Sequence, residues 1–313
     1  MSTGCQEIMS DRVPPDVARY VIAPHALAEN LGAARTWQRM MTAHVKMLHE
    51  LGDRIDPAYL TGFARLELDP LRVPSIPEIN SRIEAIGWTA VSVDGYVPSR
   101  VYATLLAARV FPIATFMRGE HHIDYAPAPD LVHDVLGHLP MLFDPRHRAY
   151  VQRLAQVMKM AQGNDDDQRL YEANRHLSTL MSRCASSEEI GMAEARARRA
   201  RMAAREAPSE EAALGRIFLW SIEFGLIGTT NEFRLFGAAL MSSHQEGRLA
   251  CHGDAQICSY SMDVIQHDIE FSNLQYRYYA ANDYGVFHQV LTSYESRMAS
   301  RRAEERRDVA SNA

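Results

Sequence analysis

One short segment, Pro129 to Pro140, constrains the fold of this 313-residue chain more than any other. Its sequence, PDLVHDVLGHLP, places two histidines and two acids inside an apolar run. Asp130 stands where it can cap a helix that begins after Pro129, and Gly137 and Pro140 predict where that helix stops. This composition indicates a metal site close to the end of a helix.

The spacing of the two histidines limits the kind of metal site. His133 and His138 are five residues apart, which on a regular α-helix separates their side chains by about 140°. A widened last turn at Gly137 would bring the two imidazoles together. The four-residue histidine spacing of the H-E-x-x-H zinc helix does not occur here, which argues against that class of zinc protease.

A third ligand is available in the segment FLWSIEFGL, residues 218–226, where Glu223 is the only charged residue. A buried, unpaired carboxylate costs several kcal/mol, so an acid in such a segment calls for a cation. Two imidazoles and one carboxylate form the facial triad that holds ferrous iron in oxygen-using enzymes. The alternative is that His133 caps a helix, His138 ends it and Glu223 pairs with an arginine; composition alone leaves the two interpretations evenly balanced.

The chain also resembles a known family, the pterin-dependent aromatic amino acid hydroxylases. Their fingerprint is Pro-Asp-x-x-His-Glu-x-x-Gly-His-x-Pro, followed later by Glu-Phe-Gly, and Asp134 replaces the family's first Glu here. The resemblance extends from about Trp37, through residues 57–60 and 73–80, to Tyr278 and Tyr279. It implies a mainly α catalytic domain with a few short strands.

The resemblance implies two cofactors. Fe(II) would be held by His133, His138 and Glu223. Tetrahydrobiopterin, or a related tetrahydropterin, would supply electrons so that dioxygen is split and the ring of an aromatic amino acid is hydroxylated.

The family's cofactor-binding residues map onto a loop and the helix that follows it. The backbone of Gly95, Tyr96 and Val97 would bind the pterin by hydrogen bonds, and the ring of Tyr102 would stack on it. Asp134 is expected to have a catalytic role and to contact the pterin or a bound water. It is one methylene shorter than the family's Glu.

The substrate-binding residues are also carried over by position. Arg118 stands where the family places the arginine that pairs with the substrate's carboxylate, a role that suits the planar guanidinium fork. His121 and His122 fall in a polar turn and are expected to be exposed. Glu246 matches an acid near the amino acid end of the substrate. The remaining residues expected to contact the substrate are Pro129, Leu219, Trp220 and Ser242.

One departure from the family concerns specificity. The family usually has a tryptophan four residues before the ligand Glu, whereas this chain has Leu219 there and Trp220 next. One residue of helix rotates a side chain by about 100°, so Trp220 cannot fill the same space. We hypothesise a substrate or ring position other than plain para-hydroxylation of phenylalanine, with tryptophan or a shifted phenylalanine as candidates.

The domain organisation follows from length and local composition. We expect an N-terminal arm over residues 1–26, a single catalytic domain over 27–298 and a charged, frayed tail over 299–313. His138 and Glu223 are 85 positions apart, roughly twice the separation expected for the family. The extra residues, about 163–212, predict a helical insertion: an outer hairpin, a lid or an oligomer contact.

Apolar spacing and breaker residues predict the local elements. Helices are expected over residues 26–51, 57–69, 77–86 and 99–107. Two more are expected from beyond Pro140 to about residue 161, and from Leu214 toward Gly228. Strand character is expected over residues 88–93 and 110–116.

Composition excludes several partners. The net charge of −6 and pI of about 6.1 argue against nucleic acid and anionic membranes as partners. The polar N-terminus and scattered cysteines, Cys5, Cys184, Cys251 and Cys258, predict a cytoplasmic protein with free thiols. We expect a monomer or a dimer.

Two other functions stay open at this stage. A zinc-dependent hydrolase would use Asp134 or Glu246 to activate a metal-bound water. A non-catalytic helical scaffold would use the metal only to pin two helices together.

Overall fold

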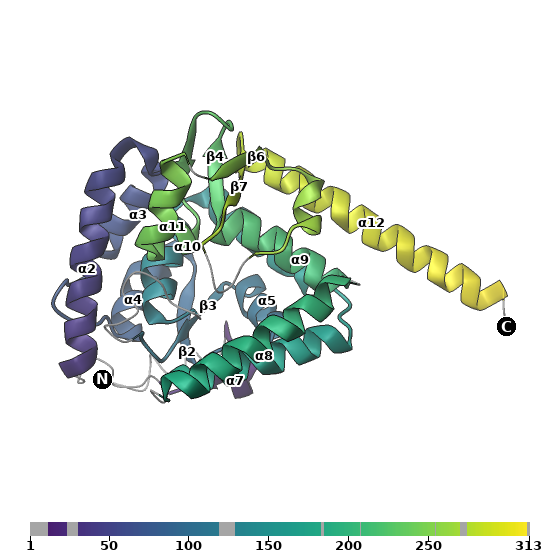
Figure 1. The fold of residues 1–313 in the computed structure, drawn as a ribbon, viewed down its shortest axis with the longest axis horizontal. Helices are drawn as coiled ribbons and strands as arrows, with labels where there is room; N and C mark the ends of the chain where they lie inside the picture. The colour runs from purple at the N-terminus through teal and green to yellow at the C-terminus, as the bar shows by residue number, and fades with distance from the viewer. Residues whose placement is uncertain are drawn as a thin grey trace.

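Helices and two small sheets make up the described residues, which are 12–23, 31–118, 129–182, 185–206, 208–253, 255–269 and 274–311 of a computed structural model (Figure 1). The helices are α2 (Leu31–Leu51), α3 (Pro57–Leu66), α4 (Ile76–Ile83), α5 (Ser99–Ala107), α6 (Pro145–Met158), α7 (Asp165–Ser182), α8 (Ser187–Glu206), α9 (Glu210–Phe218), α10 (Ala238–Ser242), α11 (His244–Cys251) and α12 (Tyr284–Ser311). The strands are β1 (Val21–Ile22), β2 (Thr89–Val93), β3 (Val110–Ala114), β4 (Gly225–Gly228), β5 (Phe233–Leu235), β6 (Gln256–Ser259) and β7 (Arg277–Ala281). The prediction of a mainly α fold with short strands is confirmed.

The first sheet has the order β1-β2-β3, with β2 and β3 parallel and β1 antiparallel to β2. Every residue of β2 and β3 is buried, as in parallel strands that are covered on both faces. The N-terminal segment was expected to be an extended arm. Instead, its Val13 and Val17 pack with Val91 and Val97, so this segment forms one edge and one face of the sheet.

The second sheet has the order β5-β4-β7-β6 and begins directly after Glu223. The expected helix from Leu214 toward Gly228 is therefore wrong beyond Glu223, because residues 225–228 form β4. A Cβ on Gly225 would lie 2.2 Å from the Ser221 oxygen and 2.4 Å from the Phe236 ring. The absence of a side chain at Gly225 thus lets the chain turn sharply from helix into strand.

Helices α7 and α8 form an antiparallel pair across the front of the molecule in Figure 1, below α9. Their inward faces bury small residues, among them Ala173, Ala193 and Ala197. The expected helical insertion at about 163–212 corresponds to this pair, which we call the α7–α8 hairpin.

The C-terminal residues continue α12 rather than forming a frayed tail. Arg302 pairs with the buried Glu210 and donates a hydrogen bond to the Met160 oxygen, which ties α12 to the start of α9. Beyond this contact the helix extends away from the body (Figure 1). Among the described helices, none is both long enough and apolar enough to cross a membrane.

Candidate metal centre and its cavity

Three side chains predicted to bind a metal converge in the structure, and all three come from π-helical turns. His133 and His138 occupy the first π turn, His133–His138, and Glu223 ends the second, Leu219–Glu223. In a π turn the backbone hydrogen bonds join residues five apart, instead of four apart as in an α-helix. His133 and His138 are five apart, so the π turn places both on one side. The expected widening of the turn is confirmed, but the helix does not stop at Gly137: it runs on as a tight 3₁₀ turn to Phe143.

Close backbone packing holds the first π turn in place. A Cβ on Gly137 would lie only 2.6 Å from the Ala238 oxygen, so glycine allows α10 to approach the turn. From the other side, the buried Tyr59 hydroxyl donates a hydrogen bond to the Leu136 carbonyl and lies 3.0 Å from His44 Nε2. Sequence reasoning missed the role of Tyr59, because its partner lies 77 positions further along the chain.

The distances among the three side chains fit a metal ion. The Nε2 atoms of His133 and His138 are 3.1 Å apart. The Glu223 oxygens lie 3.3 Å from His133 Nε2 and 3.1 Å from His138 Nε2. Donors that bind one ion at about 2.1 Å and at right angles are themselves about 3 Å apart. The donor set therefore matches one face of an octahedral site for Fe(II).

Asp134 also lies within reach, since its ligand atoms and those of the two histidines fall within 4.8 Å of one another. However, its Oδ2 accepts a hydrogen bond from the Ala114 backbone N–H at 2.8 Å. Glu223 lies within 3.3 Å of both imidazole Nε2 atoms, which makes it the better candidate for the third ligand. Burial raises the pKa of Asp134 to about 6, against the opposing effect of His133.

Charge coupling within the triad is strong. Burial alone would raise the pKa of Glu223, but the imidazoles of His138 and His133 outweigh it and hold that pKa well below its usual range. Burial likewise opposes a charged imidazole at His133, yet Glu223 raises the pKa of His133. A carboxylate that stays ionised beside two nitrogen donors is suited to a divalent cation.

Ser242 fixes the orientation of the first ligand. Its Oγ lies 2.9 Å from His133 Nδ1, which leaves Nε2 directed at Glu223. A metal-binding histidine is usually held in this way by a partner on its other nitrogen. Ser242 also lines the cavity, as expected for a residue near the substrate.

Arg118 is buried and already holds a carboxylate of the protein. Its Nε and Nη2 pair with Asp130 at 2.9 and 2.7 Å, and its Nη1 donates to the Ser242 oxygen at 3.3 Å. Asp130 Oδ1 also accepts a hydrogen bond from the His133 N–H, which confirms Asp130 as the cap of the metal-bearing helix. The pairing of Arg118 with Asp130 was missed, because nothing local links residues twelve positions apart.

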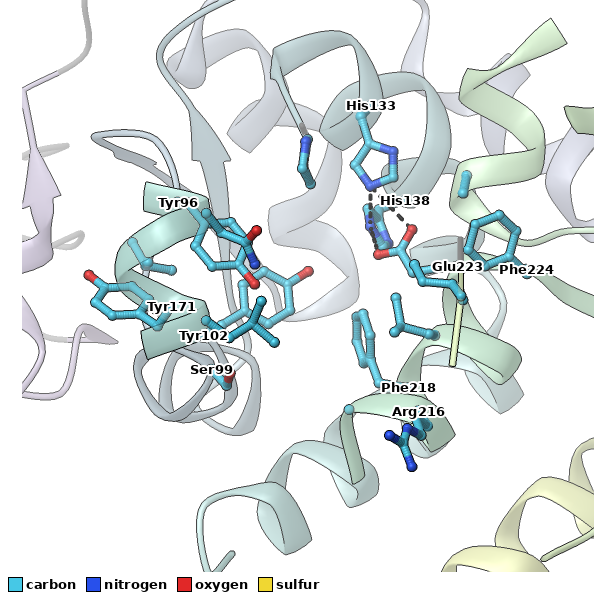
Figure 2. A pocket seen from close by; sticks show the side chains of 18 of the residues that line it. Tyr96, Ser99, Tyr102, His133, His138, Tyr171, Arg216, Phe218, Glu223 and Phe224 are labelled. Atoms are coloured by element: carbon cyan, nitrogen blue, oxygen red, sulfur yellow. Dashed lines mark hydrogen bonds and ion pairs between the residues drawn. The ribbon is translucent and has the colours of Figure 1, made fainter. Parts of the chain in front are cut away.

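The triad opens into a cavity of about 340 Å³. In Figure 2 the triad lies on one side of this cavity, and Tyr96, Tyr102 and Tyr171 gather on the other. Residues predicted to bind metal, cofactor or substrate line it, namely Gly95, Tyr96, Val97, Tyr102, Arg118, Pro129, His133, Asp134, His138, Leu219, Glu223 and Ser242.

Trp220 is the exception among the predicted site residues. Its indole turns into the core, packs edge-on against Tyr279 and donates a hydrogen bond to the His267 oxygen at 2.6 Å. The second π turn directs Leu219 into the cavity and Trp220 away from it. The structure thus corrects the expectation that Trp220 contacts the substrate.

The expected cofactor loop is held from outside by α7. Arg175 donates hydrogen bonds to the carbonyls of Asp94 and Tyr96, at 3.3 and 3.1 Å, so the Tyr96 carbonyl is already engaged. The Gly95 N–H donates to the Val93 oxygen at 3.1 Å. Of the loop's backbone groups, the Tyr96 carbonyl and the Gly95 N–H are thus engaged within the protein.

Tyr102 presents its ring to the same cavity. It meets Phe218 edge-on, with ring centroids 5.7 Å apart, and Phe218 in turn lies beside His138. An aromatic wall thus runs from the expected cofactor side to the metal ligands (Figure 2).

Sequence reasoning missed the cavity residues that come from the α7–α8 hairpin and from α9. Among these are Asp167, Leu170, Tyr171, Asn174, Arg201, Ala204, Glu211 and Arg216. The spacing of the α7 members, at i, i+3, i+4 and i+7, marks one face of a helix and was the available signal. His121, His122, Cys5 and Cys184 lie outside the described residues.

Known proteins are similar to this chain over most of its length. The family model of biopterin-dependent aromatic amino acid hydroxylases matches residues 33–178 and 185–307. Phenylalanine-4-hydroxylase of Caulobacter vibrioides is 29% identical over 215 residues, which cover 68% of this chain and 57% of that protein. The Chromobacterium violaceum enzyme of the same name is 27% identical over 266 residues, or 85% and 69% of the two proteins.

Solved structures show the same fold. The C. violaceum phenylalanine hydroxylase structure with bound iron(III) and 7,8-dihydrobiopterin has a TM-score of 0.68 at 22% identity, over 92% of this chain and 93% of that one. The Legionella pneumophila phenylalanine hydroxylase gives a TM-score of 0.64 at 22% identity, over 90% and 96%. With most of its length matched by the family model, this chain belongs to the family of biopterin-dependent aromatic amino acid hydroxylases.

Proposed function

We propose that this chain is an iron- and tetrahydropterin-dependent monooxygenase that hydroxylates the ring of an aromatic amino acid. The observation that carries this proposal is the convergence of two imidazoles and one carboxylate beside a cavity with an aromatic wall. The relatives named phenylalanine-4-hydroxylase support it. A zinc hydrolase or a metal-pinned scaffold would not need Tyr96 and Tyr102 on the side of the cavity opposite the triad.

Each group would have a defined task. When bound, iron and the reduced pterin supply the activation of dioxygen. His133, His138 and Glu223 would hold the metal and leave its other positions open, while Ser242 keeps His133 turned toward it. Tyr102 and Phe218 would exclude water from the space between cofactor and metal.

The substrate's carboxylate is proposed to meet Arg118. Since Asp130 engages two nitrogens of this guanidinium, the contact would use Nη1, next to the Ser242 carbonyl. Asp130 thus orients the Arg118 guanidinium without occupying all of its nitrogens. A fixed guanidinium loses less freedom on binding than a mobile one.

The substrate is proposed to be phenylalanine or tryptophan. The names of the relatives favour phenylalanine. Leu219, however, leaves a smaller wall in the cavity than a tryptophan would, and Trp220 does not replace it. This departure is the reason to expect a larger ring or a shifted ring position.

One assay tests the proposal. Iron-loaded protein is incubated with tetrahydropterin and with phenylalanine, tyrosine or tryptophan in turn, and products are identified by mass spectrometry and NMR. We expect pterin-dependent oxygen uptake and a ring-hydroxylated product with at least one of them, and neither with His138→Ala. Bound metal without pterin-dependent oxygen uptake for any substrate would contradict the proposal.

A further inference from the structure

The α7–α8 hairpin is fixed against the cavity at the cofactor loop. Arg175 of α7 binds the Asp94 and Tyr96 carbonyls, and Tyr171 stacks on Tyr96 with centroids 6.1 Å apart. Gly95 has φ +67°, and a Cβ there would lie 2.8 Å from the Ser178 hydroxyl oxygen. These contacts fix which residues of the hairpin face the cavity.

Arg201 is the arginine that α8 directs into the cavity. Arg196, Arg198 and Arg199, in the same arginine-rich run, are exposed, whereas the Arg201 side chain is only 13% exposed and lines the cavity. It lies on the inward face of α8 between Ala197 and Ala204, at spacings of four and three residues. These small neighbours leave room for a guanidinium beside the helix.

Two other arginines, Arg205 and Arg216, lie near Arg201. Arg201 and Arg205 share one acid, Asp268, at 3.6 and 4.0 Å. Arg216, also in the cavity wall, lies close enough to Arg201 to lower its pKa, although burial is the main cause of that lowering. Arg201 thus has two other guanidinium groups near it and is paired with one carboxylate, Asp268, so an additional anion beside Arg201 would be stabilised.

We propose that Arg201 binds an anionic group, a carboxylate or a phosphate, carried by a ligand of this cavity. The site is separate from Arg118, whose Nε and Nη2 are held by Asp130. It rests on the proposed function only in taking the ligand to be the amino acid or the reduced pterin. The anion is then either an acidic group on the side chain of the pterin or the carboxylate of the amino acid, and the second outcome would move that carboxylate from Arg118 to Arg201.

The test measures direct binding to iron-free protein by calorimetry, so it does not depend on turnover. One pair of probes is phenylalanine and phenethylamine, which lacks the carboxylate. The other is a tetrahydropterin with a neutral hydroxylated side chain and the same pterin with a phosphorylated side chain. Arg201→Gln removes the cation, and Arg199→Gln, an exposed position on the same helix, is the matched control.

We expect Arg201→Gln to reduce the preference for the anionic member of one pair by about tenfold, as for the loss of a charged hydrogen bond, and the affected pair identifies the source of the anion. Arg199→Gln should leave both preferences unchanged. If folded Arg201→Gln protein retains both preferences, the inference is overturned.

A second variant should have the opposite effect on binding of the anionic probe. Asp268→Asn keeps an oxygen for its hydrogen bond with the Ile269 N–H but removes the competing negative charge. Binding of the anionic probe should therefore become tighter, whereas a purely structural role for the ion pair would weaken it. Weaker or unchanged binding would overturn the inference even if Arg201→Gln does not fold. A loss of anion preference without any hydroxylase activity in the parent would leave this inference standing and contradict the proposed function.

Discussion

At the scale of single residues, the three candidate metal ligands could be picked out from the sequence, but the side chains that contact them could not. His133, His138 and Glu223 are polar residues in apolar segments, and that contrast is visible in any sequence. Arg118 and Asp130, by contrast, meet across a loop, and Ser242 reaches His133 from 109 positions away. Only the fold brings these pairs together, so their contacts could not be derived from local patterns.

Removing a ligand should remove the metal. We expect His138→Ala, His133→Ala or Glu223→Ala to lower iron content to background, because two protein ligands hold ferrous iron too weakly. Ser242→Ala, which removes only the hydrogen bond to His133 Nδ1, should weaken iron binding by about 10- to 100-fold. Iron content is measured on dialysed protein, and full occupancy in His138→Ala would show that the triad is misassigned.

Leu219→Trp should change specificity. An indole at this position would fill cavity space beside Glu223. Transition-state stabilisation, measured by kcat/KM, should therefore fall by about 1–3 kcal/mol for the larger substrate relative to the smaller one. The measurement is kcat/KM for phenylalanine and tryptophan together with the identity of each product. Leu219→Met, of similar volume, is the control. The same ranking and the same products in Leu219→Trp would mean that this residue does not set specificity.

Glu246 should make stability depend on pH. Burial raises the pKa of this acid from 4.5 to about 7, although Tyr278 and the Gln275 N–H donate hydrogen bonds to it. Between those values the unfolded chain loses a proton that the folded chain keeps. The free energy of unfolding therefore falls as pH rises through this window, by up to about 3 kcal/mol.

Glu246→Gln should abolish that dependence and stabilise the protein above pH 7, as measured by urea unfolding of iron-free protein from pH 4.5 to 8. Glu232→Gln, at an exposed position, is the control. A parent-minus-variant difference that does not vary with pH would refute the assignment.

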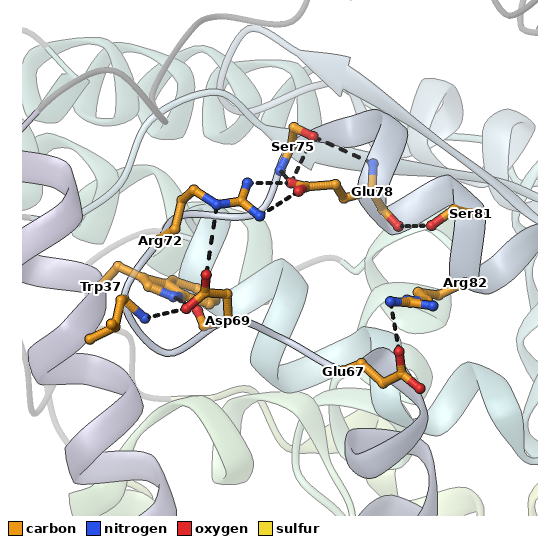
Figure 3. Close-up of polar contacts among 9 residues, drawn as sticks. Trp37, Glu67, Asp69, Arg72, Ser75, Glu78, Ser81 and Arg82 are labelled. Atoms are coloured by element: carbon orange, nitrogen blue, oxygen red, sulfur yellow. Dashed lines mark hydrogen bonds and ion pairs between the residues drawn. The ribbon is translucent and has the colours of Figure 1, made fainter.

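At the scale of helices and strands, elements with strong local signals were predicted well. The start of α4 is an example, because Ser75 and Glu78 form a capping box and Arg72 forms an ion pair with Glu78 (Figure 3). Helices α2 to α5 and strands β2 and β3 likewise appear close to where apolar spacing placed them. The second sheet was not predicted, because its strands of three to five residues carry too few side chains to show a period.

The α7–α8 hairpin was expected to be an outer hairpin, a lid or an oligomer contact. Its many alanines and arginines predicted little to bury, and one face of each helix lines the cavity. On α7 the helical spacing of the cavity residues was a usable signal, but on α8 Arg201 and Ala204 give no apolar contrast from which periodicity could reveal that face.

Replacing residues 165–206 with a short Gly-Ser linker should leave a folded protein. The main hydrophobic core takes no buried member from this part of the described chain. Hydroxylation should fall on the order of 10²-fold, because Arg175 and Tyr171 no longer position the cofactor loop. Cooperative thermal unfolding and product formation are the two measurements. Failure to fold would show that the hairpin is part of the core, and unchanged turnover would show that the loop needs no support.

At the scale of the whole molecule, α12 connects regions that are distant in sequence. Its N-terminal half supplies Phe287, Leu291 and Tyr294 to the core, and Arg302 reaches Glu210 at the start of α9. The expected boundary at residue 298 cuts through this helix. Charge-rich composition indicated a loose end, but composition cannot show that one arginine meets a buried acid 92 positions away.

Two truncations separate these parts of α12. Ending the chain after Arg302 removes residues 303–308, which are exposed, together with those that follow, and should change the free energy of unfolding by less than about 0.5 kcal/mol. Ending it after Met298 also removes the partner of Glu210 and should cost about 1–3 kcal/mol. Urea unfolding measures both. Equal stability of the two truncated proteins would mean that the Arg302–Glu210 pair contributes nothing.

The two π turns also determine where this protein can gain or lose residues. A π turn is an α-helix that has accepted one additional residue, so deleting one residue from 133–138 or 219–223 would restore regular winding and rotate a ligand away by about 100°. Between these two segments, residues 161–164 before α7 lie outside any helix or strand, so a change of length there would leave both π turns intact. Length variation in a lineage of such proteins should therefore accumulate between the two ligand segments and not within either one.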